Sequence, residues 1–485
     1  MTKDDAVSQG RLARDGLLDA DAVAMAQQVI DRVRADRIET VRVLFVDPHG
    51  ILRGKTVTAD ALPSVFRSGL GAPATLLLKD LSGRTVFPVW SAEAAVGANP
   101  MAGAGDMLMV PAPETFRVLP WAPHSAWVFC DLAFTNGTLV PFAPRQILRR
   151  ALDRLSSRGW EMHVGLEVEF HLFDLADPRL AHGDGGMPSA PPETRLLAPG
   201  YQFLSETVYD RLEPALDTLR RSAQGLGLPL RSVEVEMGPG QVEFVFEPAA
   251  PMDHADNMIM LRAMAKEVAA RHGMHASFMC RPRIENGASV GWHLHQSLVE
   301  TGSGRNLFMP EEGEDLTTVA SGWIAGLLAH AEESCLLTTP TVNGYKRYQP
   351  FQLAPDRIQW GRDNRGAMVR GLMTPGDKAS RIENRVAEPA ANPYFVFAAQ
   401  ILSGLSGVES RAKAPPPVVT PYDADAPGLP KSLIAAIEAF EHGTLYADTL
   451  GDDFRGYIAT LKRAEWNRYL MTVSEWEHRE YFGVL

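Results

Sequence analysis

Cysteine is scarce in this chain, and long apolar runs are missing from it. Cys130, Cys280 and Cys335 are the three cysteines among 485 residues, and none belongs to a CxxC pair. The lack of a CxxC pair excludes a thiolate zinc site, and so few cysteines are typical of a protein in a reducing compartment. No apolar run approaches the ~20 residues of a membrane helix, and the first residues lack the basic start and apolar core of a signal peptide. We therefore expect a cytoplasmic protein without a membrane segment.

Positive charge is also in deficit, with 47 Lys and Arg residues against 59 Asp and Glu residues and a net charge of −12. A nucleic-acid partner usually requires a basic face, so the composition argues against one. The hydrophobic content of 45% and charged content of 22% are typical of a soluble globular protein and exclude a disordered one. A chain of 485 residues is long enough for two or three domains.

The N-terminal part changes from helical to strand periodicity near residue 37. Apolar residues at helical spacing predict a helix over residues 19–37. Alternation over residues 41–45, followed by the turn sequence Asp-Pro-His-Gly at 47–50, predicts a hairpin into residues 51–57. We predict further strands at residues 75–78, 85–89, 107–110 and 126–131. This pattern indicates a helical extension over residues 1–36 and a mostly β domain over residues 37–141.

Residues 142–485 alternate between helical and strand patterns and form the predicted larger domain. We predict a strand at 161–172 and helices at 146–157, 252–272 and 320–332. Two segments rich in proline, 177–200 and 415–430, are predicted loops. The chain closes with predicted helices at 433–440, 454–462 and 473–481.

Acidic residues recur at alternate positions in apolar strand sequences. Glu167 and Glu169 are two residues apart in a strand pattern, so both side chains project from one face. Two such charges on a half-buried strand are costly unless a cation compensates them. The alternative is an edge strand with a solvated acidic face.

Two further segments add the same kind of group. Glu236 and Glu243 flank a Gly-Pro-Gly break, and His293 and His295 share one strand face. Mg²⁺ and Mn²⁺ prefer oxygen ligands with little nitrogen. Two cations of this kind bridge and neutralise ATP phosphates during phosphoryl transfer. Five glutamates and one histidine on short strands would make a site for two or more Mg²⁺ or Mn²⁺ ions, and such a site points to ATP.

Arginines gather among apolar residues at 343–347, 360–370 and 381–385. Guanidinium forks match carboxylates and phosphates in bidentate fashion, which favours an anionic substrate together with a transferring phosphoryl group. The alternative is that these arginines form salt bridges with the glutamates described above.

In chain order, these segments resemble the motifs of the glutamine synthetase family. Residues 165–173 and 236–243 are similar to its two metal strands, and 291–298 to its HxHxSL strand. Residues 343–347, 364–370 and 381–385 are similar to its NxYKR, NR…R and RIExR motifs. The resemblance covers roughly residues 37–485. It identifies the chain as a member of this family.

The resemblance implies a role for each matching residue. It implies one cation held by Glu169, Glu236 and Glu243 and a second held by Glu167, His293 and Glu383. It also implies that Arg347 and Arg385 bind the carboxylates of glutamate. Arg365 and Arg370 would hold the moving phosphoryl group. The residues on the nucleotide side would be His295, Ser297, Lys378 and Arg381.

The resemblance also implies a fold, an assembly and a mechanism. The fold is α+β, with an N-terminal β-grasp domain before a catalytic α/β domain with an antiparallel sheet. Active sites form between neighbouring subunits of a ring-shaped homo-oligomer, usually a dodecamer. The reaction proceeds through γ-glutamyl phosphate, which a nitrogen nucleophile then attacks.

Three positions depart from the ammonia-using members of the family. Asp80 is similar to their ammonium-binding aspartate but lies in a different local sequence, and it is our candidate base or ammonium ligand. Leu353 stands where the flap glutamate is usual, and Trp292 where methionine is common. An acceptor pocket that loses a carboxylate and gains apolar surface favours an amine with a carbon skeleton. Asp80 could instead be a solvated turn residue, and Leu353 and Trp292 could belong to the core.

We therefore expect an ATP-dependent ligase that joins glutamate to a small amine. The amines considered are polyamines, alkylamines, ethanolamine and anilines. Ammonia-dependent glutamine synthetase is the main alternative. A catalytically silent family member is less favoured, because every predicted metal ligand position carries Glu or His. A guanidino kinase is disfavoured because the β-grasp segment and the HxH strand are present.

Overall fold

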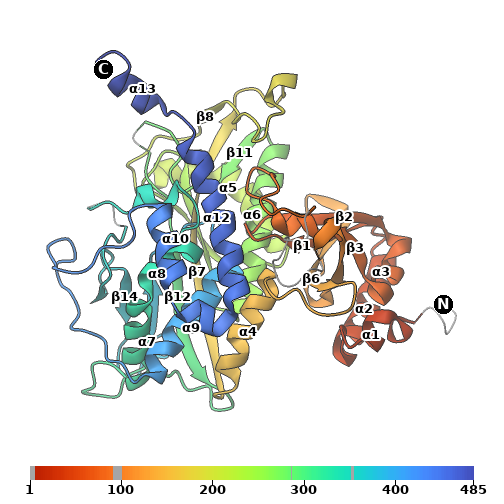
Figure 1. The fold of residues 1–485 in the computed structure, drawn as a ribbon, viewed down its shortest axis with the longest axis horizontal. Coiled ribbons are helices and arrows are strands. Elements are labelled where there is room, and N and C mark those ends of the chain that lie inside the picture. Colours follow the sequence, from red (N-terminus) through yellow and green to blue (C-terminus); the bar gives the residue numbers. More distant parts are fainter. Residues whose placement is uncertain (1–5, 91–100, 286, 351–353) are drawn as a thin grey trace.

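Two β-sheets organise the chain in the computed structural model, which describes residues 6–90, 101–285, 287–350 and 354–485. The smaller sheet belongs to the N-terminal part, and the larger sheet with most of the helices belongs to the remainder (Figure 1). Within the described residues, no helix is both long and apolar enough to cross a bilayer.

The smaller sheet has the strand order β2-β1-β6-β4-β3, and β5 pairs with β6. Its strands are β1 (Thr40–Val46), β2 (Leu52–Thr58), β3 (Leu70–Pro73), β4 (Asp106–Pro111), β5 (Arg117–Leu119) and β6 (Ala122–Phe134). The helices of this part are α1 (Arg11–Arg14), α2 (Ala20–Ala35) and α3 (Leu62–Ser68). β1 and β6 run parallel, whereas β1 and β2 are antiparallel.

The predicted N-terminal helix and hairpin are confirmed. The side chain of Asp19 caps α2 by accepting from the backbone N–H of Ala22. In the hairpin, Asp47 Oδ1 accepts from the backbone N–H groups of His49 and Ile51. Gly50 has a φ of +74°, a conformation that glycine adopts without strain. These contacts explain why the turn sequence predicted the hairpin correctly.

Two predicted strands of the N-terminal part are wrong. Residues 75–78 belong to a 3₁₀ helix over Ala74–Leu78, whose buried residues are Ala74, Leu77 and Leu78. Their spacing of three and four positions places them on one side of a helical turn, which a run of leucines without alternation does not distinguish from a strand. Residues 85–89 form no regular strand and contribute an isolated bridge between Lys79 and Thr85.

The larger sheet has the strand order β13-β14-β15-β12-β7-β10-β9, and β8 and β11 also pair with β7. Its strands are β7 (Trp160–Leu175), β8 (Thr194–Leu196), β9 (Leu230–Val235), β10 (Gln241–Phe246), β11 (Met274–Ser277), β12 (Trp292–Glu300), β13 (Trp360–Arg362), β14 (Val369–Leu372) and β15 (Arg381–Asn384). Among the described residues its neighbouring strands are antiparallel, except that β13 and β14 are parallel. The sheet is therefore mixed, and the expected antiparallel pairing is confirmed except at the β13–β14 edge.

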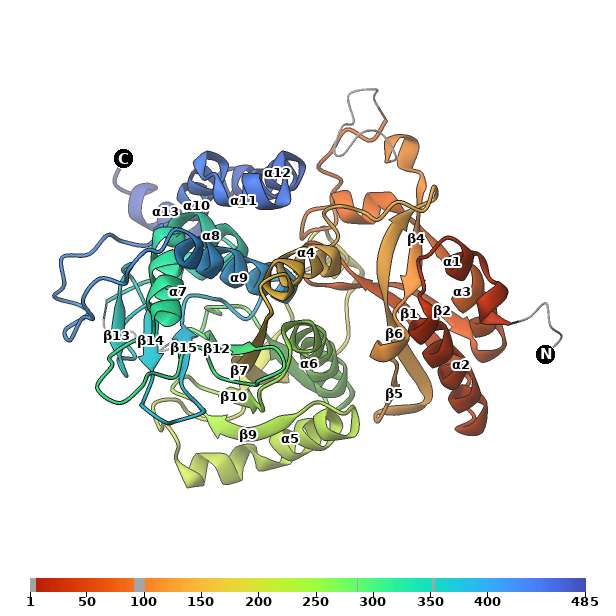
Figure 2. The same cartoon turned by 90° about the horizontal axis from the view of Figure 1, so that it is seen from below.

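Helices cover this sheet and join it to the N-terminal part. They are α4 (Pro144–Ser156), α5 (Glu206–Gly225), α6 (Pro251–Arg271), α7 (Thr318–Ala329), α8 (Ala331–Thr338), α9 (Pro393–Glu409), α10 (Leu433–His442), α11 (Leu445–Leu450), α12 (Asp452–Leu470) and α13 (Glu475–Tyr481). Figure 2 shows α7, α8 and α9 above the sheet and α5 beside its β9 edge. The predicted helix at 320–332 is interrupted at His330, whose ring contacts Glu333 and Ser406.

Buried polar contacts hold the two parts of the chain together. Arg262 of α6 donates to the carbonyl oxygens of Gly50, Pro389 and Ala391. Asn392, which precedes α9, donates to the carbonyl oxygens of Asp47 and Pro48. The β1–β2 turn is therefore bound directly to the segment between β15 and α9, and the packing of the two parts is fixed by specific donors.

Candidate active site

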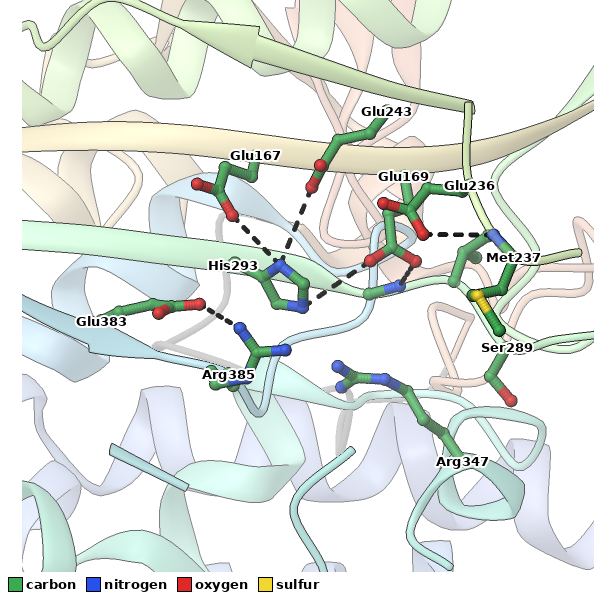
Figure 3. A network of polar contacts seen from close by, with 12 residues as sticks. Glu167, Glu169, Glu236, Met237, Glu243, Ser289, His293, Arg347, Glu383 and Arg385 are labelled. Carbon is green, nitrogen blue, oxygen red and sulfur yellow. Dashed lines mark hydrogen bonds and ion pairs between the residues drawn. The ribbon is translucent and has the colours of Figure 1, made fainter. Parts of the chain in front are cut away.

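The central strand β7 and its neighbours bring the predicted acidic residues together. Glu243 of β10 lies opposite Glu169 of β7, and His293 of β12 lies opposite Glu167. Glu383 of β15 lies opposite His295 of β12. Strand registers thus place carboxylates and imidazoles from four strands on one face, and Figure 3 shows His293 among the carboxylates.

The cluster contains three overlapping groups in which ligand atoms lie within 4.8 Å of one another. These groups are Glu169–Glu236–Glu243, Glu167–Glu243–His293 and Glu167–His295–Glu383. The first matches the first predicted cation set. The second predicted set, Glu167–His293–Glu383, is divided between the other two groups, and His295 joins it. All six predicted ligands therefore lie in one cluster, with Glu167 and Glu243 each shared between two groups.

Like charges dominate the part of the cluster around Glu169. Burial and then the charge of Glu169 raise the pKa of Glu236 to about 8 and the pKa of Glu243 to about 10. Glu243 Oε1 is buried and has no hydrogen-bond partner among the described residues. A bound cation would compensate both a buried oxygen without a donor and carboxyls that resist ionisation. The donor set therefore fits a hard cation.

The other end of the cluster is already compensated by cations of the chain. Burial is the largest single effect and opposes ionisation of Glu383, but the charges of Arg385, His293 and His295 together outweigh it and lower the pKa of Glu383 to about 2. Arg370 Nη1 also donates to Glu383, at 3.0 Å. Burial similarly opposes ionisation of Glu167, yet hydrogen bonds from His293 and His295 hold its pKa far below its usual value. Part of the arginine cluster thus forms the salt bridges that were the alternative interpretation.

The hydrogen bonds of His295 define its tautomer. Arg381 Nε donates to His295 Nδ1 at 3.1 Å, so Nδ1 must be the unprotonated acceptor. Nε2 then carries the proton and donates to Glu167 Oε1 at 2.9 Å. Arg381, His295 and Glu167 consequently form one directed chain of hydrogen bonds from β15 across β12 to the central strand β7.

Four residues predicted for the nucleotide side line one cleft beside Glu167. This cleft has a volume of about 350 Å³. The predicted residues in its wall are His295, Ser297, Lys378 and Arg381. Sequence reasoning missed other residues of the wall, namely His163, Arg231 and Phe246. A cleft with cationic and apolar walls suits a nucleotide, because phosphates require positive groups and a base requires apolar contact.

The two arginines predicted to bind glutamate border the cluster. The guanidinium of Arg347 packs against the backbone of Gly291, where an added Cβ would lie 2.5 Å from Arg347 Nη2 and 3.1 Å from His293 Nε2. Arg347 Nη1 also donates to the carbonyl oxygen of Val386 at 3.1 Å. Arg385 pairs with Glu383 (Figure 3). Arg365, which was predicted to hold the phosphoryl group, has an exposed side chain.

The structure places one of the two apolar residues predicted for the acceptor pocket, Trp292, and does not describe the other. Trp292 is fully buried and packs edge-on against Phe397 of α9, on the opposite face of β12 from His293. Its assignment to the pocket wall is therefore wrong, and it belongs to the core. Leu353 lies outside the described residues.

Asp80 is buried and engaged on both carboxylate oxygens. Its Oδ1 accepts from the backbone N–H groups of Ser82 and Arg84, and its Oδ2 pairs with Arg468 of α12. It is therefore not the solvated turn residue of the alternative interpretation. Its role toward the amine stays a prediction.

Sequence reasoning also gave no role to Gln241, which the structure places at the cluster. Its Nε2 donates to Glu169 Oε2 at 2.8 Å. The sequence does contain a signal for this role. Gln241 is an uncharged polar residue at the start of an apolar strand, and a buried amide requires hydrogen-bond partners.

Known proteins are similar to this chain over almost its whole length. The family described as "Glutamine synthetase, catalytic domain" matches residues 141–481. A γ-glutamylanilide synthase from an Acinetobacter species is 38% identical over 480 residues, covering 95% of this chain and 96% of that protein. The γ-glutamylethanolamide synthetase GlnA4 of Streptomyces coelicolor is 34% identical, covering 93% and 94%. A solved structure of GmaS without ligand has a TM-score of 0.77 at 29% identity, covering 94% of this chain and 99% of that chain.

Proposed function

The chain belongs to the glutamine synthetase family, and we propose that it joins glutamate to a carbon-bearing amine. It is an ATP-dependent carbon–nitrogen ligase of the glutamate–amine type. The observation that carries this function is the likeness over 95% of the chain to a protein named for an anilide product. The carboxylate and arginine cluster supplies the groups that such a reaction requires.

The proposed chemistry has two steps. In the first, an oxygen of the glutamate γ-carboxylate attacks the terminal phosphorus of ATP, and ADP leaves. In the second, the neutral amine attacks the acyl carbon of γ-glutamyl phosphate, and inorganic phosphate leaves. Arg347 and Arg385 would hold the glutamate carboxylates, and Arg365 and Arg370 the transferred phosphoryl group.

We propose Mg²⁺ or Mn²⁺ at the cluster, because its donors are mostly carboxylates. Glu169, Glu236 and Glu243 would hold one ion, and Glu167 with His293, His295 and Glu383 would offer ligands for a second. Such ions neutralise phosphate charge when bound. The adjoining cleft with Ser297, Lys378 and Arg381 would take the nucleotide.

We propose Asp80 as the group that binds the amine or takes its proton, in a site shared with a neighbouring subunit. The ion pair with Arg468 fixes the position of Asp80. For Asp80 to act as a base, Arg468 must release its Oδ2. Leu353 stays our proposal for an apolar wall.

We also propose the domain boundaries and the assembly. Residues 1–36 would be a helical extension, 37–141 a β-grasp domain and 142–485 the catalytic domain. The parallel pairing of β1 and β6 beside a hairpin supports the β-grasp assignment. A ring-shaped homo-oligomer, such as a dodecamer, is supported by the exposed apolar residues of the C-terminal segment. The three free, buried cysteines support a cytoplasmic location.

One experiment separates the proposed function from its alternatives. Phosphate release from ATP is measured with glutamate and a panel of anilines, ethanolamine, alkylamines, polyamines and ammonium. We expect a carbon-bearing amine to give a much higher kcat/KM than ammonium. Saturation by low-millimolar ammonium, with no organic amine faster, would instead favour glutamine synthetase. Absence of turnover with every amine would favour a silent family member.

The same panel tests the proposed apolar wall at Leu353. A glutamate at this position would restore a negative charge that attracts ammonium and repels an apolar skeleton. We expect Leu353→Glu to raise kcat/KM for ammonium relative to the best organic amine. Leu353→Met is the matched control and should preserve the preference. If the ratio of kcat/KM for ammonium to that for the best organic amine is unchanged in Leu353→Glu, Leu353 does not line the acceptor pocket.

A further inference from the structure

Gln241 occupies the first position of β10, between the Gly-Pro-Gly turn and Glu243. Its side chain is almost completely buried, with 2% of the residue exposed. Nε2 donates to Glu169 Oε2 at 2.8 Å and to the carbonyl oxygen of Ser289 at 3.3 Å. Oε1 accepts from the backbone N–H of Gly238 at 2.8 Å. Because a carboxylate only accepts and a backbone N–H only donates, these partners fix the orientation of the amide.

The contact with Glu169 acts on one of its two oxygens. Oε2 accepts from Gln241 and also from the backbone N–H of Gly291, at 2.9 Å. Oε1 is left facing the cluster, 3.7 Å from His293 Nε2. Two donors to one oxygen stabilise the anion and stop the carboxylate from rotating. Glu169 is thereby held with a single oxygen directed toward the place of a cation.

The contact with Gly238 acts on the turn that separates Glu236 from Glu243. A Cβ added to Gly238 would lie 2.5 Å from Gln241 Oε1 and 3.2 Å from the backbone nitrogen of Ala288. The turn can therefore approach the amide this closely only because residue 238 is glycine. Gln241 is thus bonded across to Glu169, is two residues from Glu243, and is tied to the turn that follows Glu236.

We propose that Gln241 is a positioning residue for the cation held by Glu169, Glu236 and Glu243. This role rests on the proposed metal binding by the cluster. Gln241 itself would not contact the ion but would hold its ligand Glu169 in place. A glutamine serving only to close the turn would need the Gly238 contact alone. The charge-assisted bond to Glu169 instead links the turn to a ligand on another strand. Groups that orient metal ligands in this way typically contribute 10- to 100-fold in metal affinity.

The test measures Mn²⁺ binding to the metal-free, full-length protein without ATP, glutamate or amine. Free Mn²⁺ is followed by electron paramagnetic resonance during a titration. Gln241→Met keeps the volume of the side chain but removes both donors and the acceptor. We expect Mn²⁺ affinity at one class of site to fall about 10- to 100-fold, by the effect of lost orienting groups. The other class, which contains Glu167 and His293, should change less.

Gln400→Met is the matched control. Gln400 of α9 is 2% exposed, and its Oε1 accepts from Gln296 and Asn384, with no bond to a carboxylate of the cluster. This variant should lose thermal stability like Gln241→Met and keep the Mn²⁺ affinity of the unaltered protein. Gly238→Ala provides a second route, because its Cβ displaces the Gln241 amide without removing it. We expect a smaller loss of affinity in the same direction.

The outcomes separate this inference from the proposed function. Wild-type Mn²⁺ affinity in Gln241→Met and Gly238→Ala would overturn the positioning role, whatever their melting temperatures. If Gln241→Met does not fold, Gly238→Ala alone decides. Absence of Mn²⁺ binding by the unaltered protein would overturn the metal role of the cluster and the role of Gln241 with it.

Discussion

At the scale of single residues, the carboxyls around Glu169 resist ionisation because they are buried close to one another. Glu236 and Glu243 hold their protons to pKa values of about 8 and about 10, first because of burial and then because of Glu169. Arginines and histidines already compensate Glu383 and Glu167. The two ends of the cluster therefore differ, because arginine and histidine side chains lower the pKa of the carboxyls at one end only.

This difference predicts how stability depends on pH. The unfolded carboxyls lose their protons near 4.5, so between about pH 5 and 8 the folded state binds more protons than the unfolded state. Stability of the metal-free protein should therefore fall as pH rises from 6 to 8. Saturating Mn²⁺ should reduce this fall, because the bound ion favours the ionised carboxylates. Calorimetric melting temperatures at each pH provide the measurement.

Glu243→Gln is the control for that pH dependence. The amide cannot titrate, so the variant should show a shallower fall in melting temperature and lose much of the Mn²⁺ effect. A metal-free protein whose melting temperature is constant or rises over this pH range would show that Glu236 and Glu243 are ionised without a cation.

The glutamate-binding role of Arg347 can be tested separately from nucleotide binding. Arg347→Lys keeps the charge but loses the planar fork that binds a carboxylate through two hydrogen bonds. Charge-assisted hydrogen bonds contribute about 1.5–3 kcal/mol, so KM for glutamate should rise about 10- to 100-fold. KM for ATP should change little. Arg381→Lys, on the nucleotide side, should show the opposite pattern. A rise in KM for ATP alone in Arg347→Lys would mean that the two sites were assigned the wrong way round.

At the scale of elements, α12 connects the C-terminal helices to the N-terminal part. Tyr457 donates its hydroxyl proton to the carbonyl oxygen of Leu77, and Arg468 pairs with Asp80. Both partners lie in the 77–80 segment that carries the proposed acceptor residue. The helix therefore determines where this segment lies, although more than 370 residues separate the bonded groups in sequence.

Removing Arg468 should destabilise this junction. Asp80 is 2% exposed, and Arg468→Met would leave its charge buried and without its cation partner. Breaking a buried ion pair costs about 3–5 kcal/mol, and the partial exposure of Arg468 places this case toward the lower figure. We expect a lower melting temperature, which Asp80→Asn in the same protein should partly restore. Equal melting temperatures for the unaltered protein and Arg468→Met would show that the ion pair contributes no stability.

At the scale of the whole molecule, the C-terminal segment exposes several large apolar side chains. Figure 1 shows α13 standing away from the rest of the fold. Trp476 is 62% exposed, Phe482 79% and Leu485 97%. Large apolar side chains grouped on an exposed segment are typical of an interaction surface, which is consistent with the proposed assembly.

Truncation after Leu470 should therefore weaken the assembly. The variant removes Met471, Val473, Trp476 and Phe482, so we expect smaller species in sedimentation velocity at the same protein concentration. Activity should fall in parallel, because the proposed sites form between subunits. Leu180→Ser, at an exposed apolar residue of the 177–193 loop, is the control and should sediment as the unaltered protein. Unchanged sedimentation of the truncated chain would exclude the segment from the interface.

The sequence by itself determined the features that depend on local chemistry. The Asp19 cap, the turn after Val46 and the alternation that places Glu167 and Glu169 on one face follow from neighbouring residues. Motifs in family order also predicted the family and the members of the carboxylate cluster. Local rules were insufficient where periodicity was absent, as in the leucine run ending at Leu78.

Only the tertiary structure decided which side chains share a contact. Strand register pairs Glu243 with Glu169, and it also places Trp292 in the core, on the face of β12 opposite His293. The Asp80–Arg468 pair and the amide contact of Gln241 with Glu169 join residues 388 and 72 positions apart. Such contacts depend on how strands and helices pack in space, and the hydrogen-bond capacity of a residue does not specify its distant partner.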